Sequence, residues 1–158
     1  MISIVCQTGE IVQVNVQGFT GARFDGMNLH RAMLEGKDLC QASFVEADLR
    51  GALFTHATLK SANFERAKLM NAALDHADLE RAILTQAKLI GANLAVACLR
   101  DADLSGADVA FADFRGADIR GANMACLRLA DANLADALID DATVFPAGFA
   151  LPADLRRV

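Results

Sequence analysis

Residues 101–120 read DADLSGADVAFADFRGADIR, and the same five-residue pattern continues on both sides of this stretch. From position 24 to position 149 every fifth residue is large and apolar, and 15 of these 26 central residues are Leu. Two positions before each central residue the chain has Ala in 23 of 26 repeats, the exceptions being Met27, Lys37 and Leu127. The spacing has no insertion or deletion in the sequence, which predicts an uninterrupted repeat architecture.

A period of five fits neither a helix nor a single long strand. Residues five apart on an α-helix lie about 140° apart around the axis, so they cannot form one apolar stripe. Side chains of a strand alternate with period two. The pattern fits a chain that turns a corner every five residues, with the Ala and the central residue pointing inward and the residue between them pointing outward. Such a chain forms a solenoid whose coils bury their apolar faces against one another.

The spacing of the phenylalanines indicates how many repeats make one coil. Phe24, Phe44 and Phe64 are 20 residues apart, so four five-residue sides per coil would stack their rings. The repeat resembles that of the pentapeptide-repeat proteins, through copies of Ala-(Asp/Asn)-(Leu/Phe) at 47–49, 62–64, 77–79, 92–94, 112–114 and 132–134. The resemblance implies an all-β fold, a right-handed, four-sided parallel β-helix of about six coils that is capped at both ends.

Three segments are expected within a single domain. Residues 1–17 contain two apolar runs around Thr8-Gly9 and are interpreted as an N-terminal β cap, followed by the β-helix over 18–147. Lys37 occupies an inward Ala position, where its stem would lie in the core and its ammonium would escape at the end of the rod or pair with Glu10 or Glu35. A more specific reading makes Lys37 an anchor of the cap.

Residues 148–158 depart from the repeat, and two readings of this tail stay open. Pro152 to Arg157 has the pattern of a helical turn with Pro at its start. The tail either covers the last coil or also pairs two rods end to end, and the resemblance favours dimerisation because several family members dimerise through their C-terminal coils. The residues for either role are Phe145, Phe149, Leu151 and Leu155.

Composition excludes several classes of protein. The net charge is −5 with acids and bases interspersed, which disfavours direct nucleic-acid binding. No run of 18 apolar residues predicts a membrane span, and the N-terminus has no basic lead of a secretion signal. The four cysteines form no CxxC pair, as expected of a reduced cytoplasmic protein.

No pattern typical of an enzyme, a cofactor site or a metal site is present. His56 and His76 are 20 apart and should stack, and a two-histidine metal site is conceivable. No further ligand column completes it, so exposed corner residues are the favoured interpretation. We therefore expect no catalytic residues, no cofactor and no bound metal.

Some apolar residues fall at outward positions. Met33 and Leu53 share a column, and Met70 and Ile90 share another column one corner away. A continuous stripe of these four residues would be a candidate interaction surface. Ile83, Val96 and Phe111 also point outward.

Two functional hypotheses follow. The first is a non-catalytic scaffold for protein–protein interaction with an unidentified partner. The alternative comes from the resemblance, since some family members mimic a DNA duplex and protect DNA gyrase, a type II topoisomerase, from quinolones or toxins. Basic residues in the outward columns, such as Lys68, Lys88 and Arg128, speak against a uniformly acidic mimic.

Overall fold

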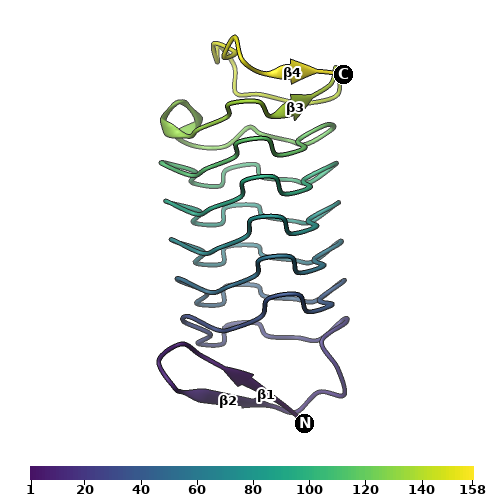
Figure 1. The fold of residues 1–158 in the computed structure, drawn as a ribbon, viewed down its shortest axis with the longest axis vertical. Coiled ribbons are helices and arrows are strands. Elements are labelled where there is room, and N and C mark those ends of the chain that lie inside the picture. Colours follow the sequence, from purple (N-terminus) through teal and green to yellow (C-terminus); the bar gives the residue numbers. More distant parts are fainter.

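The computed structural model describes residues 1–158 and shows a rod of stacked coils (Figure 1). An antiparallel hairpin of β1 (Ile2–Val5) and β2 (Ile11–Val14) lies at the N-terminal end. At the other end β3 (Leu138–Ile139) pairs in parallel with β4 (Arg156–Arg157). The only helical segment is the 3-10 turn η1 (Leu129–Asp131), and no helix has the length and hydropathy needed to cross a membrane.

Parallel bridges between equivalent positions hold successive coils together. Arg23 bridges Ser43, Ser43 bridges Asn63, and Asn63 bridges Ile83. The Phe24 N–H donates to the Ser43 carbonyl at 2.7 Å, and the Ser43 N–H donates to the Ala22 carbonyl at 2.8 Å. These bridged positions are 20 residues apart, and each five-residue repeat between them contains one bridge residue and two turn residues.

The corners depend on a left-handed backbone at their second residue. Gly occurs there repeatedly, for example Gly91 with φ of 65°, but many other residue types at this position also have positive φ. An Asp or Asn before the central residue steadies the turn by accepting a hydrogen bond from the N–H two residues later. Asn63 accepts from Glu65 at 2.9 Å, and Asp113 accepts from Arg115 at 3.0 Å. These short polar side chains thus stabilise the backbone of the turn that follows them.

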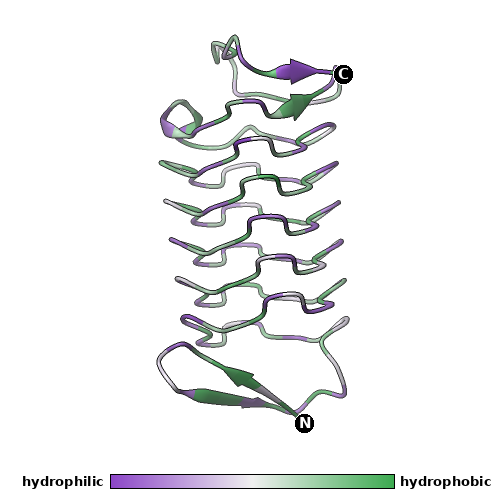
Figure 2. Cartoon of the chain, in the orientation of Figure 1, coloured by the Kyte–Doolittle hydropathy of each residue, from purple (hydrophilic) through white to green (hydrophobic).

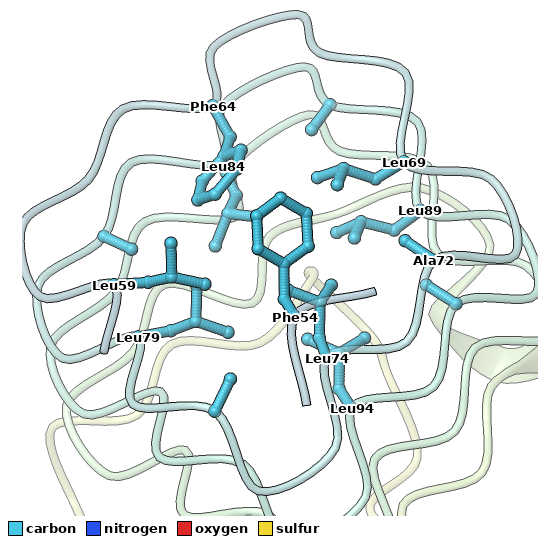
Figure 3. Packing of buried hydrophobic residues seen from close by; sticks show 14 of the residues in the cluster. Phe54, Leu59, Phe64, Leu69, Ala72, Leu74, Leu79, Leu84, Leu89 and Leu94 are labelled. Atoms are coloured by element: carbon cyan, nitrogen blue, oxygen red, sulfur yellow. The ribbon is translucent and has the colours of Figure 1, made fainter. Parts of the chain in front are cut away.

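The interior is a continuous apolar column without any buried polar residue. The rings of Phe24 and Phe44, and of Phe44 and Phe64, stack with centroids 4.9 Å apart. Figure 3 shows equivalent side chains of successive coils pointing inward one above the other, such as Phe64 with Leu84 and Leu69 with Leu89. The small Ala at the start of each side leaves the room that these large central residues fill.

The expectation of an unbroken spacing is wrong at residues 125–131. Cys126 is buried whereas Leu127 is 57% exposed, so the small inward residue comes one position early. Leu127 therefore bridges Asp108, although the regular register would pair Asp108 with Arg128. The extra residue of this side is absorbed by η1 and by Arg128 in a left-handed conformation, after which Asn133 resumes the normal register with Asp113.

A second break follows β3, and it overturns the inward position expected for Val144. The corner gains a residue, so Val144 is 51% exposed and bridges Asn123, whose regular partner would be Thr143, while Phe145 packs on the core. Asp140 stabilises this longer corner by accepting hydrogen bonds from the N–H groups of Gly121 at 2.9 Å and Ala142 at 3.1 Å.

The helical turn expected at 152–157 is also wrong. Residues 156–157 form β4 instead, because the open edge of β3 offers backbone partners: Arg156 N–H donates to the Ala137 carbonyl at 2.9 Å. Figure 2 shows β3 as hydrophobic and β4 as hydrophilic. Two exposed arginines thus occupy the outermost strand, where charge discourages further edge pairing.

Lys37 does not have the buried stem that its repeat position predicts. The residue is exposed, because no coil lies below this side of the first coil to cover it. No carboxylate lies within 4.0 Å of its ammonium, so the ion pair expected with Glu10 or Glu35 is absent. The ammonium lies 5.9 Å from the centroid of the Phe19 ring instead.

Candidate functional site

The outward apolar residues fall into two groups on adjoining parts of the rod. Met33 bridges Leu53, and Leu53 bridges Ala73, so these residues form one outward column. Met33 is 43% exposed, and Leu53 is partly exposed. This column is apolar over the first three coils and continues as Asn93 and Asp113.

Met70 and Ile90 lie in successive coils at the corner just before this column. The Asn71 N–H donates to the Ile90 carbonyl at 3.0 Å, which sets the two corners one above the other. Both side chains are partly exposed. Arg50 occupies the same corner one coil earlier, where it binds Asp48, so a charged residue lies beside the Leu53 end of the stripe. The four predicted residues share one region of the surface but do not form an uninterrupted apolar stripe.

Phe111 extends the Met70–Ile90 corner into the next coil. The Gly91 N–H donates to the Ala110 carbonyl at 2.9 Å, which places Phe111 one coil beyond Gly91, at the same corner as Ile90. Phe111 is 72% exposed and has a φ of 59°. A bulky side chain in the left-handed region is strained, and such strain gathers at functional positions. We call Met70, Ile90 and Phe111 the apolar corner.

Val96 is also both exposed and left-handed, and it lies at the corner on the other side of the Asn93–Asp113 column. It is 55% exposed with a φ of 59° although it is β-branched. The sequence places Phe111 and Val96 outside the rod but does not connect them with Met70 and Ile90. A usable signal was present, because both bulky residues occupy the corner position that elsewhere in the regular coils holds Gly or a polar or charged residue.

The predicted C-terminal residues separate into a packed group and an exposed one. The rings of Phe145 and Phe149 stack with centroids 5.6 Å apart, and both pack against the core, as does Leu155. Leu151 remains 45% exposed. Three of the four side chains are thus engaged within their own chain, and the exposed apolar surface at this end comes from Leu151, Val144 and Val158.

An open pocket of about 500 Å³ separates β1 from the first coil. Ile2, Val5, Phe19 and Met33 form its apolar part, and Glu35 and Lys37 its polar rim. The Val5 carbonyl accepts a hydrogen bond from Met33 at 2.8 Å, which closes one end of the pocket. The pocket therefore continues the Met33–Leu53 column towards the N-terminal end.

Most acidic residues of the outward columns are neutralised by a neighbouring arginine. Asp113 forms hydrogen bonds with Arg115, and Asp118 with Arg120, at 2.6–3.0 Å. Hydrogen bonds from these arginines lower the pKa of both carboxyl groups. The pair Asp48–Arg50 has the same two-residue spacing, whereas Asp108 is bound by Arg128, which lies 20 residues later in the next coil. The surface consequently lacks long columns of free negative charge.

The histidines and cysteines do not converge on a reactive centre. The rings of His56 and His76 stack with centroids 4.9 Å apart, as their spacing predicts. No group of three or more His, Cys, Asp or Glu side chains is arranged to hold a metal ion. Burial raises the pKa of the Cys126 thiol to about 12, which disfavours the nucleophilic thiolate.

The family model described as pentapeptide repeats (8 copies) matches this chain in three overlapping segments, at residues 38–69, 67–106 and 97–136. No curated protein matches the chain.

Solved structures with the same repeat are similar to it. HetL, a pentapeptide-repeat protein involved in heterocyst differentiation regulation in the cyanobacterium Nostoc sp. strain PCC 7120, is 24% identical, with 87% of this chain and 83% of that chain covered and a TM-score of 0.49. The Nostoc protein alr5209 is 40% identical over 61% of this chain and 84% of that chain, with a TM-score of 0.45. QnrB1, a plasmid-mediated fluoroquinolone resistance protein, is 18% identical over 89% and 85%, with a TM-score of 0.45. None of these TM-scores reaches 0.5.

Proposed function

Because the chain belongs to the pentapeptide-repeat family, we propose that it is a non-catalytic scaffold that binds a protein partner along one side of a rigid rod. The proposed surface consists of the Met33–Leu53 column and the apolar corner. The finer architecture we propose is that of the family, a right-handed, four-sided β-helix with covered ends. The regular register of the bridges supports the four sides.

The observation that supports this function best is the state of Phe111. An aromatic ring that is 72% exposed gains little from folding, and its left-handed backbone disfavours it further. Gly, Asn and His adopt this left-handed conformation at a lower energetic cost, and they occupy it at Gly91, Asn71 and His76. Binding to a partner would bury the ring and supply a reason for its presence. Aromatic residues are also the typical anchors of protein interfaces.

The duplex-mimic hypothesis receives less support from the charges. A mimic competes for a basic groove through unneutralised negative columns. Here Asp48, Asp108, Asp113 and Asp118 are each bound to an arginine. The net charge of −5 is thus spread over a surface of mixed sign. We propose mimicry of DNA towards gyrase as the second candidate function only.

A comparison of variants tests the scaffold proposal. Immobilised wild-type protein and Phe111→Asn protein would be exposed to the same cell extract, with Ser61→Asn as a matched variant at another left-handed corner, outside the proposed surface. We expect one set of proteins to bind the wild type and the Ser61→Asn variant but not the Phe111→Asn variant. Equal recovery of the same proteins by all three would contradict the proposed surface.

A supercoiling assay with DNA gyrase tests the second candidate. The scaffold proposal expects no change in supercoiling at tens of micromolar protein. Inhibition that weakens with added salt would instead favour the mimic.

A further inference from the structure

A second open pocket lies where three successive coils turn the same corner. It has a volume of about 370 Å³ and is lined by His30, Arg31, Arg50, Gly51, Met70 and Asn71. These residues occupy equivalent corner positions, because the Arg31 N–H donates to the Arg50 carbonyl and the Gly51 N–H to the Met70 carbonyl, each at 2.9 Å. The pocket shares only Met70 with the apolar corner.

Gly51 forms the floor of this pocket. A Cβ atom at Gly51 would lie 3.3 Å from Cγ and 3.8 Å from Nε of Arg31, so the Arg31 side chain lies along the rod over the glycine. Asn71 stands at the same corner position in the following coil. The missing side chain at Gly51 therefore leaves a hollow between Arg31 and Asn71.

The charges around the hollow are positive and poorly compensated. Nine of the 11 arginines have a carboxylate oxygen within 4.0 Å, and the exceptions are Arg31 and Arg156. No acidic residue lines the pocket. The adjoining column runs Asp48, Lys68, Lys88 and Asp108, so each lysine has one acidic and one basic neighbour, and neither lysine is in an ion pair. Because Asp48 is already bound to Arg50 and Asp108 to Arg128, positive charge exceeds negative charge at this corner.

The donors at this corner suit an oxyanion. Arg31 offers an unpaired guanidinium, and the Asn71 side chain offers an amide N–H. Arg50 uses Nε and one terminal nitrogen for Asp48, at 2.8 and 2.6 Å, which leaves its other N–H groups for a ligand. His30 adds a ring nitrogen donor. We propose that this pocket binds a phosphate group, because several guanidinium and amide donors meet without a competing carboxylate.

The phosphate group can be free or carried by a partner. Free phosphate would occupy the hollow alone. A phosphorylated side chain would bring its flanking residues against Met70, which forms the apolar wall of the pocket. The two sources share the same donors and differ only in the contact with this wall.

Titration of the full-length protein with inorganic phosphate, followed by ¹H–¹⁵N NMR, tests the site. We expect the amide signals of Arg31, Gly51 and Asn71 to shift and saturate. Arg31→Gln should weaken binding about tenfold. Gln is compatible with this backbone because Gln41 and Gln86 have the same left-handed conformation at equivalent corners. The matched control is Arg156→Gln, which removes the other unpaired arginine and should leave the titration unchanged.

A second variant fills the hollow without removing a charge. Gly51→Asn retains a residue that accepts positive φ and should abolish the saturable shifts. No saturable shift in the wild type, or equal titrations of wild type, Arg31→Gln and Gly51→Asn, would overturn the proposal. The same titration with a phosphoserine peptide that has Leu beside the phosphoserine distinguishes the sources. Tighter binding than inorganic phosphate, lost in Met70→Ala, identifies a group carried by a partner, and equal binding identifies free phosphate.

Discussion

The regular coils between residues 41 and 124 and the C-terminal end of the rod use the same kinds of residue with different results. In the regular coils every central residue is fully buried, from Phe44 to Met124. At the C-terminal end, residues at the same repeat positions are partly or largely exposed, as Phe149 and Val144 show. At the N-terminal end Phe24 and Leu29 stay fully buried, because the β1–β2 hairpin packs against the same core. A repeat position therefore buries its side chain only where the register is kept and a coil or a cap covers it. The repeat thus encodes a local shape, and the neighbouring coils supply its stability.

The largest effect should come from comparing an inner ring with a terminal one. Phe54→Ala removes a fully buried ring that packs edge-on against Phe44 and Phe64, with centroids 5.9 Å from each, and should destabilise the protein by about 3–5 kcal/mol. Phe149→Ala should cost less than about 2 kcal/mol, because part of that ring is already exposed. Urea unfolding measures both, and equal losses would show that the last coils bury their residues as completely as the inner ones.

A smaller difference is expected between two glycines that share a φ of 65°. Gly26→Ala should destabilise the chain by about 1 kcal/mol through the backbone alone, since nothing lies within 4 Å of the added Cβ. Gly91→Ala carries the same backbone cost and also brings Cβ to 2.6 Å from Asn71 Oδ1. Because the Asn71 amide can rotate away, the difference should be a few tenths of a kcal/mol. In the Asn71→Ala background thermal unfolding should give the two glycines equal costs, and a persistent gap would contradict the steric reason.

Acid should weaken the regular coils through their paired carboxylates. Hydrogen bonds from Arg115 and Arg120 lower the pKa values of Asp113 and Asp118. A carboxyl whose pKa is lower in the folded chain stabilises it above the unfolded pKa, about 3.9, and loses that contribution as pH falls through the folded pKa. Urea unfolding should therefore show a decline in stability from pH 5 to pH 2.

Asparagine is the control for the acid effect, because Asn93 and Asn123 occupy equivalent positions and make the same turn hydrogen bonds. The double variant Asp113→Asn, Asp118→Asn should lose less stability than the wild type between the two pH values. An identical decline would mean that other groups cause the acid sensitivity.

The regular coils and the irregular segments also differ in how well the sequence alone predicts them. Spacing predicted the stacks of Phe24, Phe44 and Phe64 and of His56 and His76, because a constant coil length puts equivalent positions in register. The spacing predicted the wrong register at Leu127 and Val144. There the sequence keeps the five-residue period, but the bridges of the backbone are shifted by one position. Both positions accept an apolar residue, so the pattern could not reveal the shift.

The structure of the rod ends and of the surface sites cannot be predicted from the five-residue period alone. The exposed position of Lys37 follows from the absence of a coil beneath it, and β4 follows from the free edge of β3. Met70 and Ile90 share one corner, as their 20-residue spacing predicts, and Phe111 could have been added from the sequence, because it is a bulky residue at a corner position that elsewhere holds mostly Gly or polar residues. The phosphate pocket was missed because its signal is the absence of a partner for Arg31, which only the structure shows.

The most direct test of the account is the free energy of unfolding of Phe111→Gly, compared with that of Phe54→Ala. We claim that the inner rings stabilise the rod whereas Phe111 is held outward against its backbone preference. Phe111→Gly should therefore leave stability unchanged or raise it, by up to about 1 kcal/mol. A loss of several kcal/mol, comparable with that of Phe54→Ala, would contradict the account, because it would show that Phe111 serves the fold and not a partner.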